Sequence, residues 1–330
     1  MISGLKSWEH DVYNQAMSTT RQDKQLNFQN QRRKNYFEGW YFKQVSSDES
    51  VIFSVIPSMM RVNNQEQALI QVILAEKVDG AWRILTDRLD FPMSAFLHTS
   101  DPFTLNIGGN TFSREGLSLN INTPALPTSA LAPTIMGPFS YLPFMECIHG
   151  INSLHHSLTG TLQIGSKTVS FDGGVGYIEK DWGHSFPKSY LWLQSNHFAR
   201  RPSCLFFSWA NIPLGPFAFP GFICHLWMAG QHHRFATYNG ARCVIHDMSE
   251  DKVSLTLKKR EISLSIHAAV DVRGALSAPK HGQMDHQIKE GLAGTISFQL
   301  ENKKTNEVMV DTSSLSGVEI VPRLIRTPRG

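Results

Sequence analysis

The sequence FDGGVGYIEKDWGHSFPKSYLWLQSNHF, residues 171–198, lies near the middle of the chain and predicts two strands separated by Pro187. Before Pro187, the charged residues Glu179 and Asp181 stand among apolar and aromatic ones. After Pro187 the sequence alternates between two residue classes, which is the pattern of a strand with two different faces. One face of a strand over residues 190–198 would carry Tyr190, Trp192, Gln194, Asn196 and Phe198. An aromatic face with amide groups indicates a ligand pocket, although a strand with one solvated face has the same pattern.

Segments of the same kind occur on both sides of this stretch, from Tyr36 onward. They are short, rich in aromatic and β-branched residues, and separated by turn residues, which is typical of antiparallel sheet. Turn sequences such as Asp79-Gly80 support hairpins, and helical periodicity is scarce. The other predicted strands are 36–44, 51–57, 69–76, 81–85, 103–107, 117–122, 158–164, 167–172, 204–210, 222–229, 233–238, 241–246, 253–258, 261–268, 292–300 and 307–311. The sequence therefore predicts an all-β fold with little helix.

The predicted strands fall into two groups of similar size, which indicates two antiparallel β-barrels or sandwiches side by side. We place an N-terminal arm at residues 1–35, the first barrel at 36–187 and the second at 188–330. The segment 124–150 carries five prolines, too many for a helix or for the interior of a sheet. Because its aromatic residues need cover, we expect it to form a lid or a plug between the domains.

The composition excludes several classes of function. With 41% hydrophobic residues the chain can bury a full core, and 31 basic against 28 acidic residues give a balance too even for nucleic-acid binding. The 4 cysteines are far apart and form no C-x-x-C pair, so they are expected to be buried free thiols. Neither a signal peptide nor a run of about eighteen apolar residues is visible, and we therefore expect a cytoplasmic protein.

Motifs with known chemistry fit the sequence poorly. Gly174-Val-Gly176 lacks the third glycine and the long helix of a dinucleotide site. Ser185 is followed by Phe-Pro rather than by the x-Gly of a nucleophile elbow, so it is not expected to be a nucleophile. Potential metal ligands cluster at two places: Glu146, His149, His155 and His156, and then His232 and His233. Their spacing does not match a zinc-binding helix, and adjacent residues of a strand point to opposite faces, so we expect no metal site.

Acidic residues on two predicted strands have aromatic neighbours. Glu38 shares a face with the aromatic residues of strand 36–44, and Asp181 shares one with Tyr177 and Glu179. Burial among aromatic rings raises the pKa of a carboxyl group and can keep it protonated as a general acid. The alternative is a buried carboxylate that pairs with Lys180, with Lys43 or with an arginine.

Three blocks, in the same order, resemble the tocopherol cyclase family. They are Tyr36-Phe-Glu-Gly-Trp-Tyr-Phe-Lys43, Tyr177-Ile-Glu-Lys-Asp-Trp-Gly-His-Ser-Phe-Pro187 and Trp192-Leu-Gln-Ser-Asn196. Segments 228–240 and 294–319 are also similar, so the resemblance covers nearly all of residues 36–320. The family is similar to carotenoid hydratases and to fungal pericyclases of lipocalin-like fold. This implies two calycin-type barrels with a ligand pocket.

The resemblance also implies cofactor-free cyclisation of a hydrophobic prenylated phenol, quinol or related isoprenoid. An acid protonates the alkene and an oxygen atom traps the resulting cation. Asp181 or Glu38 would supply the proton, and His184 would relay it. The ligand would contact Trp40, Tyr177, Trp182, Trp192, Gln194 and Asn196, of which the indole rings would stabilise the cation.

One departure from the family leaves the chemistry open, because residue 181 is aspartate where the plant enzymes have asparagine. Two alternatives therefore stand beside a cyclase: a lipocalin-like carrier of a lipophilic small molecule, and an alkene hydratase. In each case the expected partner is a hydrophobic small molecule and not nucleic acid. The apolar segments 124–150 and 217–222 would fit peripheral contact with a membrane or packing within the protein.

Overall fold

The structure is a computed structural model that describes residues 23–113, 133–142, 145–214, 217–228 and 230–322. The predicted strand 117–122, most of the N-terminal arm and parts of the segment 124–150 lie outside these residues. Within them the fold is all-β, as the sequence predicts. Helix is confined to α1 (Asp23–Leu26) and to the short 3-10 segments η1 (Met93–Ala95), η2 (Gly137–Tyr141) and η3 (Thr237–Asn239). None of the described helices has the length and hydrophobicity needed to cross a membrane.

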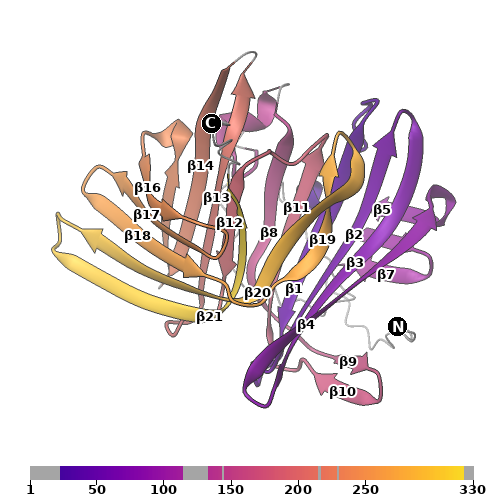
Figure 1. Cartoon of the computed structure of the whole chain (residues 1–330), viewed down its shortest axis with the longest axis horizontal. Coiled ribbons are helices and arrows are strands. Elements are labelled where there is room, and N and C mark those ends of the chain that lie inside the picture. The colour runs from indigo at the N-terminus through magenta and orange to yellow at the C-terminus, as the bar shows by residue number, and fades with distance from the viewer. Residues whose placement is uncertain (1–22, 114–132, 143–144, 215–216, 229, 323–330) are drawn as a thin grey trace, which may run out of the picture. The chain divides into compact units, whose positions relative to one another are not determined.

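The strands are antiparallel and mostly joined by tight turns (Figure 1). Those of the first half are β1 (Tyr36–Val45), β2 (Val51–Val62), β3 (Gln65–Val78), β4 (Ala81–Pro92), β5 (Phe96–Ser100), β6 (Phe103–Ile107), β7 (Asn110–Ser113), β8 (Cys147–Ser157), β9 (Thr161–Ile164), β10 (Lys167–Ser170) and β11 (Val175–Gly183). Those of the second half are β12 (Tyr190–Ser195), β13 (Ser203–Leu214), β14 (Phe217–Met228), β15 (Gln231–Ala236), β16 (Arg242–Met248), β17 (Lys252–Lys259), β18 (Ile262–Ala269), β19 (Gly274–Lys280), β20 (Gln283–Asn302) and β21 (Glu307–Val321). Several strands are longer than predicted, because backbone pairing continues beyond the apolar stretch that reveals a strand in the sequence.

The chain forms two compact units. The first unit consists of Met1–Leu142, Cys147–Ser185 and Leu276–Gln287. The second unit consists of Pro143–Glu146, Phe186–Ala275 and Ile288–Gly330. Each unit is built on one large sheet, and β20 contributes residues to both units.

The sheet of the first unit has six strands in the order β4-β3-β2-β1-β11-β8, and the described pairings leave it open. An open sheet differs from the closed barrel that the resemblance implies. Closing a sheet requires bulges or bends that curl it, whereas β1 to β4 pair without a register shift. The pairing of β8 with β11 does contain register shifts.

One face of this sheet is a packed aromatic core. Trp40 on β1 is buried, and its ring centre lies 6.4 Å from Phe28, 6.4 Å from Phe96 and 6.2 Å from Phe103. The residues before β1 and the strands β5 and β6 therefore cover this face. Because side chains alternate along a strand, Glu38 points to this covered face and Gly39 to the other.

The sheet of the second unit follows the order β15-β14-β13-β12-β21-β20-β18-β17-β16, with β19 beside β20, and is also open in the described pairings. Leu191 and Leu193 on β12 join a large apolar core on one face. Trp192 and Gln194 point to the opposite face. β12 ends at Ser195, so Phe198 does not continue the Trp192 face as predicted, but packs in the core with its ring centre 5.1 Å from Phe298.

Candidate active site

Glu38 is part of a buried ion pair on the covered face of the first unit's sheet. Its side chain is 0% exposed and contacts the ammonium group of Lys180. The Tyr36 hydroxyl donates a hydrogen bond to Glu38 at 2.8 Å, and the backbone N–H groups of Gln29 and Asn30 donate at 2.8 and 3.1 Å. The acceptor positions of this carboxylate are therefore used by the protein itself.

Lys180 lies between two indole rings. Its Nζ is 4.9 Å from the ring centre of Trp40 and 5.1 Å from that of Trp182, which are distances of cation–π contact. Nζ also donates to the carbonyl of Asn27 at 2.5 Å. Burial lowers the pKa of Lys180 to about 8, although Glu38 acts in the opposite direction. The indole rings that the resemblance assigns to a substrate cation thus already contact a cation of the protein.

For Glu38 the structure shows the alternative that the sequence left open, a buried carboxylate paired with Lys180. Together with the Trp40 indole, which donates to the Leu26 carbonyl at 2.7 Å, this pair fastens residues 26–30 to the sheet. We therefore assign Glu38 a structural role.

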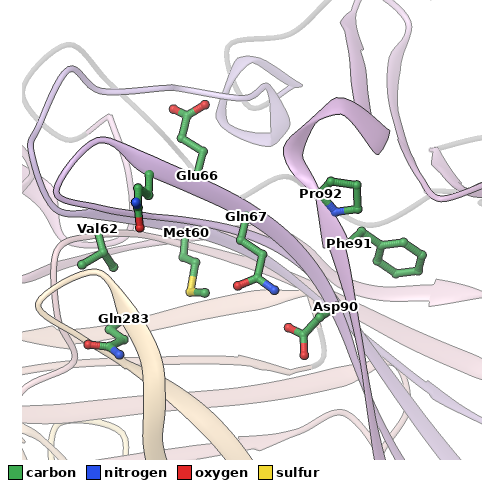
Figure 2. A pocket seen from close by; sticks show the side chains of 9 residues that line it. Met60, Val62, Glu66, Gln67, Asp90, Phe91, Pro92 and Gln283 are labelled. Atoms are coloured by element: carbon green, nitrogen blue, oxygen red, sulfur yellow. The ribbon is translucent and has the colours of Figure 1, made fainter.

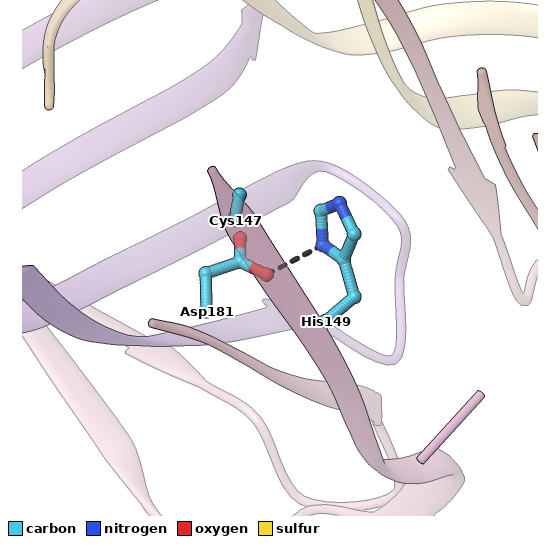
Figure 3. A group of neighbouring side chains, drawn as sticks. All are labelled: Cys147, His149 and Asp181. Carbon is cyan, nitrogen blue, oxygen red and sulfur yellow. Dashed lines mark ion pairs between the residues drawn. The ribbon is translucent and has the colours of Figure 1, made fainter. Parts of the chain in front are cut away.

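The opposite face of the same strands carries a cluster of ionisable groups (Figure 3). Asp181 on β11 lies opposite His149 on β8, and Asp181 Oδ1 is 2.5 Å from His149 Nδ1. The same nitrogen is 3.1 Å from Glu179 Oε1. The Tyr177 hydroxyl donates to Glu179 Oε2 at 2.9 Å. We term Asp181, His149, Glu179 and Tyr177 the acid cluster.

Charge and burial differ within the acid cluster. Glu179 is 2% exposed, whereas the side chains of His149 and Asp181 are 18% and 20% exposed. Burial raises the pKa of Glu179, and the neighbouring Asp181 raises it further. Burial also disfavours a charge on His149, but the two carboxylates outweigh it and raise the pKa of His149 to about 10. The imidazole is therefore charged at neutral pH. Its Nδ1–H group is hydrogen-bonded to Glu179, and it forms an ion pair with the partly exposed Asp181.

Cys147 brings a possible metal ligand to the same place. Ligand atoms of Cys147, His149 and Asp181 all lie within 4.8 Å of one another, and zinc binds thiolate, imidazole and carboxylate. However, His149 Nδ1 and Asp181 Oδ1 are only 2.5 Å apart. Two ligand atoms at about 2.1 Å from one tetrahedral zinc ion would lie about 3.4 Å apart. The geometry therefore fits an ion pair of His149 with Asp181 better than a bound metal ion.

The residue of β1 beside Asp181 is Gly39, which has no side chain. It lies opposite Asp181 on one side and opposite Ser58 on the other. A Cβ atom at position 39 would be 2.9 Å from Ser58 Oγ, closer than van der Waals contact allows. β1 consequently presents no side chain opposite Asp181, whose side chain is 20% exposed.

Three other residues that the sequence predicts for the site, all in the first unit, lie apart from the acid cluster. Trp40 and Trp182 are on the covered face, and His184 follows the end of β11. Nδ1 of His184 is 3.4 Å from Arg33 Nη1, and burial together with Arg33 lowers the pKa of His184. Its contact in the described residues is therefore with a cation and not with Asp181.

Trp192, Gln194 and Asn196 belong to the second unit and are buried. Trp192 lies opposite Glu319 of β21, which accepts a hydrogen bond from the Tyr190 hydroxyl. Asn196 Oδ1 is 2.8 Å from His197 Nδ1. As ligand contacts, these three residues stay predictions.

A surface pocket of about 540 Å³ lies elsewhere in the first unit (Figure 2). Its lining residues are Met60, Val62, Gln65, Glu66, Gln67, Asp90, Phe91, Pro92 and Gln283. The two carboxylates in it are already paired, Glu66 with Arg61 and Asp90 with Arg88. No member of the acid cluster lines this pocket.

Sequence reasoning did not identify His149 and Glu179 as proton carriers. β8 begins at Cys147, inside the segment that its prolines predict to be irregular. The available signal was the alternation of Cys147, His149 and Ile151, which places all three on one face of a strand. That this strand pairs with β11 has no counterpart in the sequence pattern.

Comparison with known proteins agrees with this architecture. A family model described as tocopherol cyclase-like matches residues 127–321, which is more than half of the chain. The chain belongs to the tocopherol cyclase-like family. In this tocopherol cyclase-like chain the match includes β8 and β11, and therefore the whole acid cluster, whereas the block 36–43 precedes it.

Solved structures show that the tocopherol cyclase-like chain has a lipocalin-like fold. A candidate AttH protein of Nitrosomonas europaea superposes with a TM-score of 0.53 at 10% identity, covering 93% of this chain and 98% of its own. Kievitone hydratase of Nectria haematococca superposes with a TM-score of 0.51 at 10% identity, covering 87% of this chain and 89% of its own. No curated protein matches the chain in sequence. At this identity the two structures establish the fold and not the activity.

Proposed function

We propose that this protein is an enzyme that protonates a carbon–carbon double bond of a hydrophobic isoprenoid, such as a prenylated phenol or quinol, and so starts a cyclisation. The observation that carries the proposal is the ion pair of His149 and Asp181, whose Nδ1 and Oδ1 atoms are 2.5 Å apart, on a sheet face where both side chains are partly exposed. Membership of the tocopherol cyclase-like family supports the reaction class.

The acid cluster has the groups that proton transfer to carbon needs. Asp181 is the more exposed of the two carboxyl groups in the cluster, and Gly39, which has no side chain, lies opposite it. In the proposed step the His149 proton passes through Asp181 to the alkene, and the electron pair of the double bond forms the new C–H bond. Transfer leaves additional negative charge on the cluster, which stabilises the carbocation beside it. A hydroxyl oxygen of the substrate then forms the C–O bond. Its O–H bond breaks with the electron pair left on oxygen, and the proton passes to solvent, from which the acid cluster is protonated again.

Glu179 and Tyr177 would support the proton donor. Glu179 binds the same nitrogen of His149, and Tyr177 fixes the second oxygen of Glu179. These contacts hold the imidazole in the orientation that faces Asp181. A ligand carrier has no need of an imidazolium between two carboxylates, because apolar binding relies on burial of surface rather than on ionisable groups.

The test is incubation of the purified protein with prenylated hydroquinones in deuterated buffer, followed by mass spectrometry of the extracted lipids. One deuteron bound to carbon in a cyclised product is expected. Asp181→Asn should reduce turnover about 10²- to 10⁴-fold while ligand affinity stays nearly unchanged. Asp79→Asn, in an exposed hairpin turn where asparagine is equally suited, is the control and should retain full turnover.

Three results would reject the proposal. Lipid that is recovered bound but chemically unaltered would indicate a carrier. Full turnover in Asp181→Asn would remove the acid cluster from the reaction, and a product with added water would indicate a hydratase instead of a cyclase.

A further inference from the structure

A second buried polar group lies in the second unit, on the face of its sheet that points away from the apolar core. His225 on β14 is 0% exposed, and its Nε2 is 3.0 Å from Nδ1 of His232 on β15. Its other ring nitrogen, Nδ1, is buried and has no hydrogen-bond partner among the described residues. Buried polar atoms in folded proteins nearly always have a partner, so this nitrogen is available to a ligand.

The strand register places His225 on the same face as the aromatic and amide side chains of β12. Gln194 lies opposite Phe206, and Phe206 lies opposite His225. Gln194 and His225 are thus two strand spacings apart, about 10 Å, with the Phe206 ring between them. On the next row Trp227 stacks on His232, with ring centres 6.4 Å apart and an interplanar angle of 25°. This face combines aromatic surface with polar groups at two separate points, which is the composition of a small-molecule site.

The two imidazoles are neutral. Burial lowers the pKa of His225 to about 3, helped by Arg234 and His232, and burial also lowers the pKa of His232. A neutral imidazole has one donor and one acceptor nitrogen, and the contact between the two rings needs a single proton. Depending on which ring supplies that proton, His225 Nδ1 is an acceptor or a donor. A hydroxyl group, which both donates and accepts, matches either arrangement.

We propose that this face binds a phenolic ligand, with the ligand hydroxyl hydrogen-bonded to His225 Nδ1 and its ring against Phe206. The choice of a phenol rests on the function proposed above, whereas the presence of a site for a hydroxyl group rests on His225 alone.

The histidine pair also provides a route for the hydroxyl proton. When the O–H bond breaks, its electron pair stays on oxygen and the proton forms a bond to His225 Nδ1. In the arrangement in which His225 Nδ1 is the acceptor, His225 carries its proton on Nε2, and this proton passes to His232 Nδ1, 3.0 Å away. His232 is partly exposed and releases its own Nε2 proton to solvent. One proton enters the pair and one leaves, so the interior gains no charge.

The experiment compares two ligands and several variants of the full chain by titration, without requiring turnover. The ligands are geranylhydroquinone and geranylbenzene, which lacks both hydroxyl groups. His225→Phe keeps a ring but has no nitrogen, and is expected to weaken hydroquinone binding about tenfold, the equivalent of one net hydrogen bond to a buried group. Binding of geranylbenzene should change less than about twofold, since it makes no such bond.

The control is His246→Phe, which replaces an exposed histidine on β16 and should leave both affinities unchanged. A second measurement uses the unmodified chain, in which geranylhydroquinone should shift the ¹⁵Nδ1 resonance of His225 and geranylbenzene should not. Equal effects of His225→Phe on both ligands, or an unshifted ¹⁵Nδ1 resonance, would overturn the inference. Discrimination of the ligands without deuterium transfer would reject the proposed reaction and leave this site standing.

Discussion

Removal of the Glu38 charge tests whether this residue is structural or catalytic. In Glu38→Gln the ammonium group of Lys180 would stay buried without a carboxylate partner. The backbone N–H groups of Gln29 and Asn30 donate to the two carboxylate oxygens of Glu38. In the glutamine variant one of these oxygens becomes an NH₂ group, which cannot accept a hydrogen bond. Breaking a buried pair in this way costs about 3–5 kcal/mol, which is a large fraction of the roughly 5–15 kcal/mol that stabilises a typical domain.

The double variant Glu38→Leu/Lys180→Met separates the loss of the pair from the loss of one charge. It removes both ions, so no lone charge remains in the core, and its cost should be smaller than the sum of the two single variants. The N–H groups of Gln29 and Asn30 lose their acceptor in the double variant as well, which keeps it below the stability of the unmodified chain.

Urea unfolding followed by tryptophan fluorescence and circular dichroism measures these differences. Glu66→Gln is the control, because the pair of Glu66 with Arg61 is partly exposed and should contribute at most about 1 kcal/mol. The reasoning is refuted if Glu38→Gln lowers the free energy of unfolding by less than about 1 kcal/mol. Normal stability with abolished turnover would show that Glu38 is the catalytic acid after all.

Two further predictions concern pH. Burial opposes a charge on His149, but Asp181 and Glu179 raise its pKa to about 10, so the imidazole should stay protonated at pH 8. NMR titration of the imidazole measures this pKa. A titration midpoint near 6.5, the ordinary value for histidine, would contradict the prediction. Burial lowers the pKa of His156 and of His225 to about 3, from about 6.5 when unfolded. The unfolded chain therefore binds more protons than the folded one between these values, and stability should fall as the pH drops from about 6.5 toward 3. Urea midpoints that stay constant over this range would rule out the explanation.

The predicted grouping of residues on strand faces is correct for both candidate acids, and the tertiary structure explains why they differ. Glu38 does share its face with Trp40, and Asp181 does share its face with Glu179. Because Glu38 lies opposite Trp182 and Gly39 lies opposite Asp181, the two carboxyl groups point to opposite faces of one sheet. The two acids therefore lie in separate environments.

The alternation of residue classes by itself determined the all-β class and which neighbours share a strand face, because side-chain direction in a strand depends only on local backbone geometry. The motif blocks alone also indicated the family. Only the tertiary structure decided that β11 pairs with β1 on one side and β8 on the other. Pairing of strands far apart in sequence depends on the packing of the whole sheet and leaves no local pattern. It is this pairing that places His149 opposite Asp181 and surrounds Glu38 with its own partners.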